Sequence, residues 1–435
     1  MNKKIFLSIL IAILILSGLL IAVDKNSKKY VMQDGVMVAM TLNGDAITKL
    51  PDEGKYTVEV TCENAKGKWT LVEVEENNVI TYEWKLIVED IKDEVSCNLD
   101  FATANLIDEA NKKSDYLKHY IIDRAVEGTS DGTGQAEGDI VHETFEDASG
   151  TMVDTGYRYE GKNPDNYVWF NNELWRIIGV FDTEIVDEDG NVTGTEKLTK
   201  IIREEPIGLI NWDKSLKNNW PGSSLYKLLN SIDGDTNSGA YLNSQDGNVS
   251  GYCFGYNTIV KANCDYTGKG LDGLTSYYGS MIENVKWYLG GISSSTDAEN
   301  SYRSPASTWY TYERGNLVYD ETSATEVDAY IGLMYGSDYG YSVKASAKCN
   351  RSKSLHSYGS KYCASESWLY NGNEWLITPT SDEKSGAMGV YNDGWLLSRT
   401  SGTFAYAVRP VVYLNSKVYK ISGTGKAVDP YTIGV

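Results

Sequence analysis

The sequence predicts a β-rich α+β protein that is located on the outer side of a cell membrane. Thirty-two tyrosines and eleven tryptophans against seven phenylalanines favour strands, because these rings combine a large apolar body with a polar tip. Several segments also alternate apolar and polar residues with a period of two. Six cysteines fall into pairs that are close in sequence. In an exported chain such pairs indicate disulfides rather than metal or redox chemistry.

The chain begins with Lys3 and Lys4 and continues with an unbroken apolar stretch over residues 5–23. A run of this length can cross a hydrocarbon core, and the two lysines favour a cytoplasmic start. Residues 1–27 are therefore predicted to be a single-pass transmembrane helix that leaves the bulk of the chain extracellular. A cleaved signal peptide is the alternative, but its apolar core is usually shorter, and Gly18 and Ala22 make a poor cleavage site.

Residues 28–101 are predicted to form a small β-sandwich. Two segments place apolar side chains on one face, at Tyr56, Val58, Val60 and Cys62, and at Cys97, Leu99 and Phe101. A bridge between Cys62 and Cys97 would contribute roughly 3–4 kcal/mol in the chain-entropy estimate. The segment looks like an immunoglobulin-like spacer, although it is too short for seven long strands.

Residues 102–126 have the spacing of an amphipathic helix. Residues 127–154 are acidic and Gly-rich, which predicts a flexible linker and a domain boundary. Residues 155–435 are expected to form one larger domain.

Hairpins and a few helices are predicted in this larger domain. Asn171-Asn172-Glu173 and Asp189-Gly190-Asn191 each separate two strand-like segments, which is typical of hairpin turns. One helix should begin near Ser223, and a second should cover residues 276–289, where apolar residues form one stripe. Late strands are expected around residues 375–378, 388–391, 395–398 and 408–414. Asn392-Asp393-Gly394 is a strong turn signal between two of them.

The order of four segments resembles a family of uncharacterised bacterial cell-surface proteins. The segments are Tyr167-Val168-Trp169-Phe170, Leu174-Trp175-Arg176-Ile177-Ile178-Gly179, Glu374-Trp375-Leu376-Ile377-Thr378-Pro379 and Val408-Arg409-Pro410-Val411-Val412-Tyr413-Leu414. The C-terminal module of that family is similar to the C-type-lectin-like fold, in the branch that contains formylglycine-generating enzymes. The resemblance implies this fold for residues 155–435, and it is weakly specific for function.

The same resemblance implies a ligand-binding patch on the strands and loops before Arg409-Pro410. Its residues are Tyr391, Asn392, Asp393, Trp395, Ser398, Arg399, Thr400 and Phe404. The alternative is an ordinary hairpin in which Trp395 belongs to the core.

The sequence assigns no catalytic residue. Formylglycine-generating enzymes use two cysteines, and Cys349 with Cys363 is the late pair here, but the surroundings expected of those enzymes are missing. Disulfides are therefore expected for this pair and for Cys253 with Cys264. Serine hydrolase motifs are missing or lack their companions. Sixty acidic residues still leave a carboxylate-pair hydrolase open, with acids beside aromatic or apolar residues at Glu173, Glu204, Glu205, Asp338 and Glu374.

A net charge of −20 argues against nucleic acid as a partner. No cofactor and no metal site are expected, although the acidic loops 187–191 and 233–237 leave calcium open. The leading hypothesis is an adhesin-like cell-surface protein that recognises an extracellular glycan or protein and contacts the membrane through its N-terminal helix. The alternatives are an extracellular hydrolase acting on glycan or cell wall, and a structural component of the envelope.

Overall fold

The computed structural model describes residues 7–9, 30–33, 36–42, 44–47, 56–76, 79–92, 94–103, 116–128, 139–187, 189–232, 249–255, 258–264 and 276–435. The chain divides into two compact units. The N-terminal unit combines Met1–Asp115 with Tyr167–Leu174 and Tyr419–Gly434. The C-terminal unit combines Tyr116–Asn166 with Trp175–Val418 and Val435. The protein is β-rich α+β, as predicted.

The N-terminal unit contains two sheets around a shared core. One sheet comprises β2 (Tyr30–Gln33), β3 (Val36–Leu42), β8 (Val95–Thr103) and β5 (Tyr56–Glu63), with β4 (Asp45–Ile47) on β3. The other comprises β1 (Leu7–Ile9), β7 (Val79–Glu89) and β6 (Lys66–Glu76). Leu86 and Val88 of the second sheet pack with Cys97 and Leu99 of the first.

Cys62 and Cys97 are joined by a disulfide and lie directly opposite each other on β5 and β8. The expected pairing is therefore present, and it connects neighbouring strands of one sheet. The bridge of antibody domains instead joins two sheets.

The expected N-terminal anchor falls largely outside the described residues. Its described part, Leu7–Ile9, is the short strand β1, which pairs with β7. No helix in the described ranges is long and apolar enough to span a bilayer.

The segment expected to be a flexible linker is largely sheet. After α2 (Leu117–Ile122) and β9 (Val126–Glu127), the antiparallel strands β10 (Ile140–Glu146) and β11 (Met152–Tyr159) join the main sheet. The linker prediction is thus wrong from Ile140 onward. Acidic composition is a poor guide here, because Glu143 is buried and paired with Arg351.

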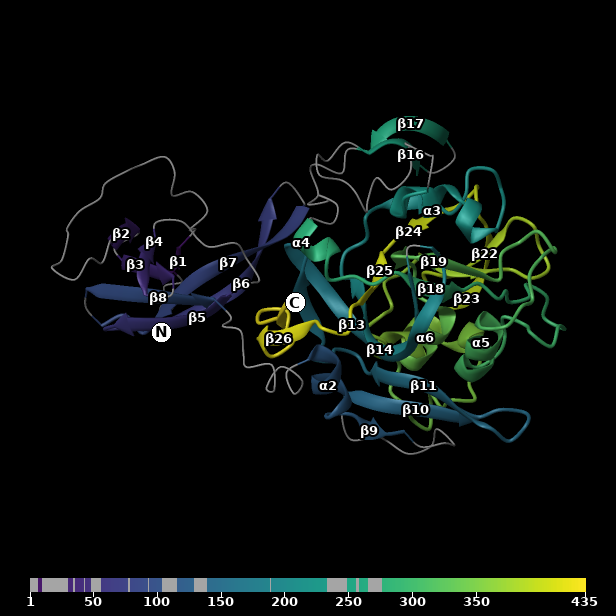
Figure 1. Cartoon of the computed structure of the whole chain (residues 1–435), viewed down its shortest axis with the longest axis horizontal. Coiled ribbons are helices and arrows are strands. Elements are labelled where there is room, and N and C mark those ends of the chain that lie inside the picture. Colours follow the sequence, from purple (N-terminus) through teal and green to yellow (C-terminus); the bar gives the residue numbers. More distant parts are fainter. Residues whose placement is uncertain are drawn as a thin grey trace. The chain divides into compact units, whose positions relative to one another are not determined.

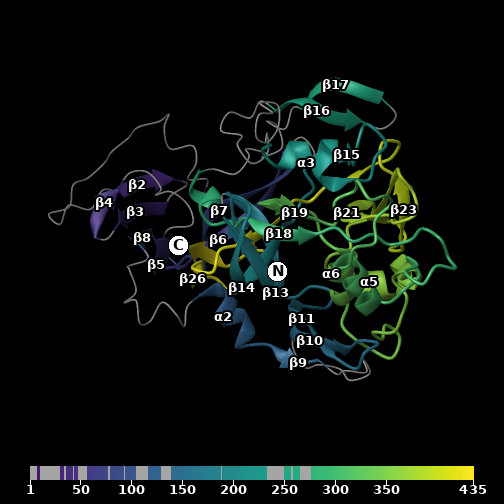
Figure 2. The ribbon, with the colours of Figure 1, turned by 45° about the vertical axis from the view of Figure 1, so that its right-hand side comes forward.

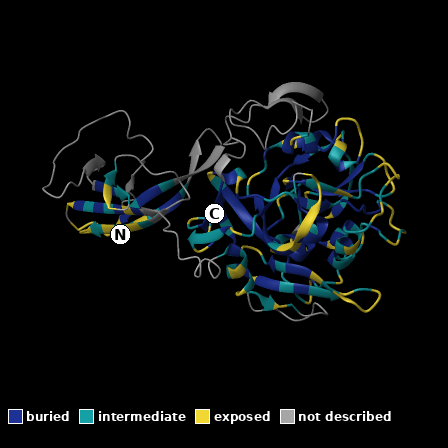
Figure 3. Ribbon diagram, viewed as in Figure 1, coloured by how far each residue is buried: buried dark blue, intermediate teal, exposed yellow. Residues whose placement is uncertain are grey.

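The main sheet of the C-terminal unit has the order β20-β25-β14-β13-β11-β10-β9, with β18 joining β13 to β19 (Figure 1). The remaining bounds are β13 (Glu173–Val186), β14 (Val192–Arg203), β18 (Val285–Tyr288), β19 (Glu326–Ala329), β20 (Ile331–Gly332) and β25 (Val411–Leu414). The predicted turn at residues 189–191 does connect β13 to β14. Most strand residues of this unit are buried, but the first five residues of β14 are exposed (Figure 3).

A second sheet has the order β15-β24-β21-β22-β23, and β23 lies at its edge. Its strands are β15 (Leu209–Asn211), β21 (Glu374–Pro379), β22 (Gly386–Val390), β23 (Leu396–Thr400) and β24 (Ala405–Ala407). The late strands were thus placed correctly by the sequence. Helices α5 (Ala306–Glu313) and α6 (Gly336–Tyr341) pack on each other and on this sheet (Figure 2).

The helix predicted over residues 276–289 is wrong for its second half. Only α4 (Ser276–Gly279) is helical, and residues 285–288 form β18, which pairs with β19. Val285 and Trp287 are buried while Lys286 and Tyr288 are half-buried, so the local period is two. The same apolar residues also fit a helical stripe, which is the usual ambiguity of a short run.

The helix predicted near Ser223 is confirmed as α3 (Ser224–Leu229). Ser223 caps its N-terminus, since Ser223 Oγ accepts the Tyr226 N–H at 3.0 Å. The other elements are β12 (Tyr167–Phe170), η2 (Trp220–Gly222), β16 (Val249–Gly255), β17 (Thr258–Cys264), η3 (Leu355–Ser357), η4 (Gly359–Cys363), η5 (Ala364–Glu366), β26 (Tyr419–Ser422) and β27 (Thr432–Gly434). Strands β16 and β17 pair. The expected Cys253–Cys264 bridge lies outside the residues whose side chains are described.

Candidate functional site

The predicted patch lies on the hairpin of β22 and β23, at the edge of the second sheet. The Tyr391 N–H donates to Trp395 O at 2.8 Å, and the Gly394 N–H donates to Tyr391 O at 2.7 Å. Gly394 has a φ of +82°, which glycine adopts without strain. Buried Tyr339 of α6 donates its hydroxyl to Gly394 O at 2.9 Å, so the interior holds this turn in place.

One part of the patch gathers around Arg399. Its guanidinium carbon lies 4.9 Å from the ring centre of Tyr391 and 5.4 Å from that of Phe404. Its Nε donates to the Tyr406 hydroxyl at 3.0 Å. The structure therefore brings three predicted residues together and adds Tyr406, which the sequence did not suggest.

A different part gathers around Trp395. This ring is 39% exposed, so it is not a core residue. Its centre lies 5.5 Å from that of His356, and His356 lies 4.8 Å from Tyr302. Trp395 therefore has its own aromatic neighbours, distinct from those of Arg399.

The polar residues of the patch form hydrogen bonds within the hairpin and with its neighbouring loops. Asn392 and Asp393 are exposed in the turn, where the Asn392 N–H donates to Asn373 Oδ1 at 2.7 Å. Ser398 donates to Glu383 at 3.4 Å. The Thr400 carbonyl accepts the N–H groups of Thr403 at 3.2 Å and Phe404 at 3.3 Å. These contacts stabilise the hairpin and the loop that follows it.

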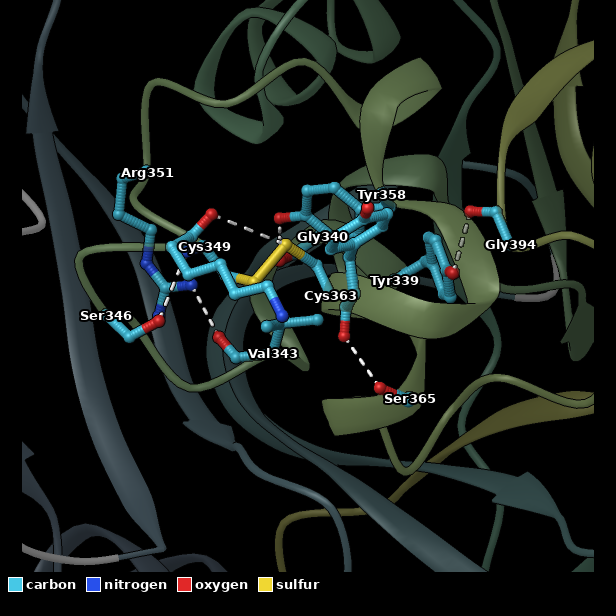
Figure 4. Close-up of a disulfide and its surroundings, with 12 residues drawn as sticks. Tyr339, Gly340, Val343, Ser346, Cys349, Arg351, Tyr358, Cys363, Ser365 and Gly394 are labelled. Carbon is cyan, nitrogen blue, oxygen red and sulfur yellow. Dashed lines mark hydrogen bonds between the residues drawn. A yellow bond between two sulfur atoms is a disulfide. The ribbon is translucent and has the colours of Figure 1, made fainter.

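Cys349 and Cys363 form a disulfide beside α6, so neither is a free thiol (Figure 4). Within the loop that it closes, Arg351 Nη1 donates to Val343 O at 2.7 Å, and the Tyr358 hydroxyl donates to Gly340 O at 2.9 Å. The bridge and these bonds hold the loop against the end of α6.

Two of the acidic residues noted in the sequence are buried in ion pairs. Glu374 accepts two hydrogen bonds from Arg409, each 2.7 Å long. Asp338 contacts Arg158 at 2.9 Å and Lys200 at 2.5 Å. Their geometry is that of structural pairs in the core.

Of the two loops considered for calcium, the structure describes residues 187 and 189–191 of the first. Asp187 Oδ1 accepts the N–H groups of Asn191 at 2.8 Å and Asp189 at 3.0 Å, which lowers the Asp187 pKa. This is the bonding of a hairpin turn. Residues 233–237 lie outside the described part, and within the described part no group of three metal-ligating side chains is found.

A small pocket of about 40 Å³ lies elsewhere in the C-terminal unit, lined by strands of the main sheet and by α5. Its lining residues are Asp154, Thr155, Gly156, Phe181, Asp182, Thr183, Glu184, Lys286, Tyr288, Tyr310, Arg314, Tyr335 and Tyr413. They come from β11, β13, β18, α5 and β25 and from the segments beside them. Sequence reasoning missed this pocket, because no local motif joins positions that lie so far apart.

Tyrosines surround Arg314 within the pocket. The guanidinium carbon stacks 3.5 Å from the ring centre of Tyr310 and lies 5.3 Å from Tyr335 and 5.9 Å from Tyr288. Tyr335 is itself fixed, because its hydroxyl donates to Tyr288 O at 3.1 Å and accepts the Tyr288 N–H at 2.9 Å. The pocket thus has a cation held against rigid aromatic walls.

Each carboxylate of the pocket lies near a basic side chain. Asp182 contacts Lys197 at 2.8 Å, and Glu184 contacts Lys286 at 3.4 Å. Asp154 Oδ2 lies 3.2 Å from a ring nitrogen of His142. These pairs leave carboxylate oxygens with spare lone pairs at the wall of the pocket.

Buried charged side chains contact Tyr335, one of the residues that line the pocket. The Tyr335 N–H donates to Asp338 Oδ2 at 3.0 Å, and Lys200 lies 4.4 Å from the Tyr335 ring centre. Burial opposes ionisation of Asp338, but Lys200 and Arg158 outweigh it and lower the Asp338 pKa to about 2. Burial lowers the pKa of Lys200 to about 8. At neutral pH the three side chains form a charged network that fixes Tyr335.

Beside Arg314, burial raises the pKa of Glu313 to about 7, against the hydrogen bonds donated by Ser337. Glu313 Oε2 lies 4.0 Å from Arg314 Nη1. Arg314 therefore faces an acid that is only partly ionised at neutral pH.

Comparison of the chain with protein-family models, with curated proteins and with solved structures finds no match.

Proposed function

We propose that this chain is a cell-surface binding protein whose C-terminal unit recognises an extracellular glycan or protein ligand. The observation that carries the proposal is the tyrosine-walled pocket around Arg314. Binding sites are typically concave and combine aromatic walls with a few convergent polar groups.

The cellular setting of the proposal rests on the disulfides. Two bridges in a β-rich chain are compatible with an oxidising, extracellular environment. Anchoring by residues 1–27, an immunoglobulin-like spacer and a C-type-lectin-like C-terminal unit are parts of the proposal that rest on the sequence and its resemblance.

The pocket holds about 40 Å³, so it would take a protruding polar group of a larger glycan or protein ligand rather than a whole sugar ring. Its carboxylate and guanidinium groups would form hydrogen bonds with such a group.

The test is binding of the full chain to an array of glycans and extracellular proteins, followed by titration of each hit. Tyr310→Ala should abolish binding, because it removes the ring on which Arg314 stacks. Tyr319→Ala is the matched control, since Tyr319 is 41% exposed and does not line the pocket. If nothing on the array binds, or if both variants lose binding equally, the proposal is contradicted.

An extracellular glycan hydrolase is the second candidate, because Asp154, Asp182 and Glu184 all line the pocket. Such an enzyme would use one carboxyl group as acid and another as base or nucleophile. Incubation of each array hit with the protein distinguishes the two candidates. New reducing ends that disappear with Asp182→Asn would favour hydrolysis over binding.

A further inference from the structure

We infer that His142 makes the pocket around Arg314 sensitive to pH, because the charge on the His142 ring determines whether Asp154 at the pocket wall is free to bind a ligand. This inference rests on the proposed function and specifies how the same site is regulated. His142 lies on β10, between β9 and β11 of the main sheet (Figure 1).

Strand pairing places His142 between two carboxylates. His142 is the backbone partner of Glu127 on β9 and of Tyr157 on β11. Two steps along β10 from His142 then face three steps along β11, from Tyr157 to Asp154, which is the pattern of a β-bulge. Gly156 lies in this bulge with a φ of +97°. The bulge brings Asp154 and Tyr157 to the same side chain, that of His142.

Each ring nitrogen of His142 faces a carboxylate. Nδ1 lies 3.1 Å from Glu127 Oε2 and 3.2 Å from Glu127 Oε1, and Nε2 lies 3.2 Å from Asp154 Oδ2. The contact of Nε2 is that of an ion pair rather than of a well-aligned hydrogen bond. A neutral imidazole has one N–H and one lone pair, so one carboxylate would face a lone pair. Both contacts are favourable only when His142 is an imidazolium.

The His142 ring is held in this position. It stacks on Tyr157, with ring centres 4.3 Å apart and planes at 12°, and the His142 side chain is 18% exposed. Burial opposes the charged form, but Asp154 and Glu127 outweigh it and raise the pKa of His142 above its ordinary value of 6.5. The ring therefore changes its charge above pH 6.5.

Asp154 connects this charge to the pocket. It lines the pocket, and its backbone carbonyl accepts the hydroxyl of Tyr310, the ring on which Arg314 stacks, at 3.0 Å. Asp154 Oδ1 already accepts the Gly156 N–H at 2.7 Å. Asp154 Oδ2 is paired with the imidazolium, and it becomes free to accept a hydrogen bond from a ligand once His142 is neutral.

The other charged groups near His142 keep their charge through neutral pH. Lys197 lies 5.3 Å from the Tyr157 ring centre and contacts Asp182 at 2.8 Å. Burial opposes the charge of Lys197, but Asp182 outweighs it and raises the Lys197 pKa above 10.5. Glu143, the next residue on β10, is buried and paired with Arg351 instead.

Two groups further from His142 also titrate near neutral pH. Burial raises the pKa of Glu313, beside Arg314, to about 7, and burial lowers the pKa of Lys200 to about 8. A pH dependence of the pocket is therefore assigned to His142 only when a His142 variant removes it.

The first experiment follows the imidazole signals of the full chain by NMR between about pH 5 and 9. The sequence has three histidines, so His119→Gln, His142→Gln and His356→Gln assign every signal. His142 should titrate above pH 6.5, and His356 should titrate below it because burial lowers the His356 pKa. The carboxyl carbon of Asp154, identified by its absence in Asp154→Asn, should shift with the midpoint of His142.

Carboxylate variants test the cause of this midpoint. Asp154→Asn should lower the His142 midpoint more than Glu127→Gln does, because the Glu127 side chain is 81% exposed and its ion pair is screened by water. Glu146→Gln, at an exposed position on β10, is the control that should leave the midpoint unchanged. A His142 midpoint at or below pH 6.5, or an Asp154 carbon that does not follow it, overturns the inference.

The second experiment measures the dissociation constant of the tightest-binding member of the glycan and protein array across the same pH range. Binding should become about 5-fold tighter or more as the pH rises through the His142 midpoint, since Asp154 Oδ2 is then free. This change should disappear in His142→Gln and persist in Glu313→Gln.

The outcomes separate this inference from the proposed function. Binding that does not depend on pH, or a pH dependence that survives His142→Gln, overturns regulation by His142 and leaves the binding function standing. If nothing on the array binds, the proposed function fails, while the imidazole and carboxyl titrations still decide whether His142 controls the state of Asp154.

Discussion

Arg351 Nη2 donates to Glu160 Oε1 at 2.5 Å, although the two residues are 191 positions apart. The same nitrogen donates to Glu143 Oε1, also at 2.5 Å, and both carboxylates are buried. Burial and the neighbouring Glu143 raise the pKa of Glu160 well above its ordinary value, although Arg351 opposes this. One guanidinium thus fastens β10 and the end of β11 to the loop closed by the Cys349–Cys363 bridge.

Replacement of this guanidinium should destabilise the protein strongly. We expect Arg351→Met to lower the free energy of unfolding by about 3–5 kcal/mol, because two buried acids lose their shared cation. Urea denaturation measures the change. Adding Glu143→Gln to this variant should recover part of the loss, whereas a midpoint equal to that of the wild type would contradict the assigned role of Arg351.

The neighbouring disulfide should contribute a similar amount. Cys349 and Cys363 are 14 positions apart, and in the chain-entropy estimate a loop of this size contributes about 3 kcal/mol. The double variant Cys349→Ser with Cys363→Ser should therefore melt at a lower temperature than the wild type. Melting with and without reductant checks this; a variant with unchanged melting temperature would show that the bridge does not stabilise the fold.

Stability should also depend on Glu313. Its pKa is raised to about 7 in the folded protein from 4.5. The folded state therefore binds the proton more tightly than the unfolded state, and this contribution is complete below about pH 4.5 and is lost as the pH rises through about 7. The shift corresponds to about 3 kcal/mol.

Denaturation at a series of pH values, with Glu313→Gln as the comparison, measures this effect. The wild type should lose stability relative to the variant between about pH 4.5 and 7. If the difference between the two proteins does not change with pH, the assignment of this proton to Glu313 fails.

The two groups of the predicted patch should respond differently to mutation. Arg399→Ala should cost about 1–2 kcal/mol of stability, since it removes the bond to Tyr406 and the stacking on Tyr391 and Phe404. Trp395→Ala should cost less than about 1 kcal/mol, because the ring is partly exposed. We expect ligand binding to persist in Trp395→Ala, and its loss at unchanged stability would place the binding site on the hairpin.

The local features of the fold were predictable where turn chemistry is explicit. Asn171 and Asn172 both have positive φ, the conformation required at the tight turn that their sequence suggested. Ser223 caps α3 for the same kind of local reason. Predictions failed where residues distant in sequence determine the local structure. Glu143 is one case, because its buried carboxylate is paired with Arg351 from another part of the chain.

In the candidate site, too, contacts between sequence neighbours were predictable and contacts between distant residues were not. The patch residues around Arg399 are neighbours in sequence, and the structure does bring three of them together. The pocket combines residues from Asp154 to Tyr413, and Arg314 becomes notable only once Tyr288 and Tyr335 stand beside it. No spacing in one sequence reveals such a set.

The path of the chain through its two units affects how the protein would respond to proteolysis. The chain enters the larger unit at Tyr116 and leaves it at Asn166 to contribute Tyr167–Leu174 to the N-terminal unit. Within that unit the ring centres of Trp84 and Trp169 are 5.9 Å apart, and Thr70 donates to Val428 O at 2.5 Å. A single cut ahead of Tyr116 would therefore not release the N-terminal segment, and the nicked chain would stay together until this unit unfolds.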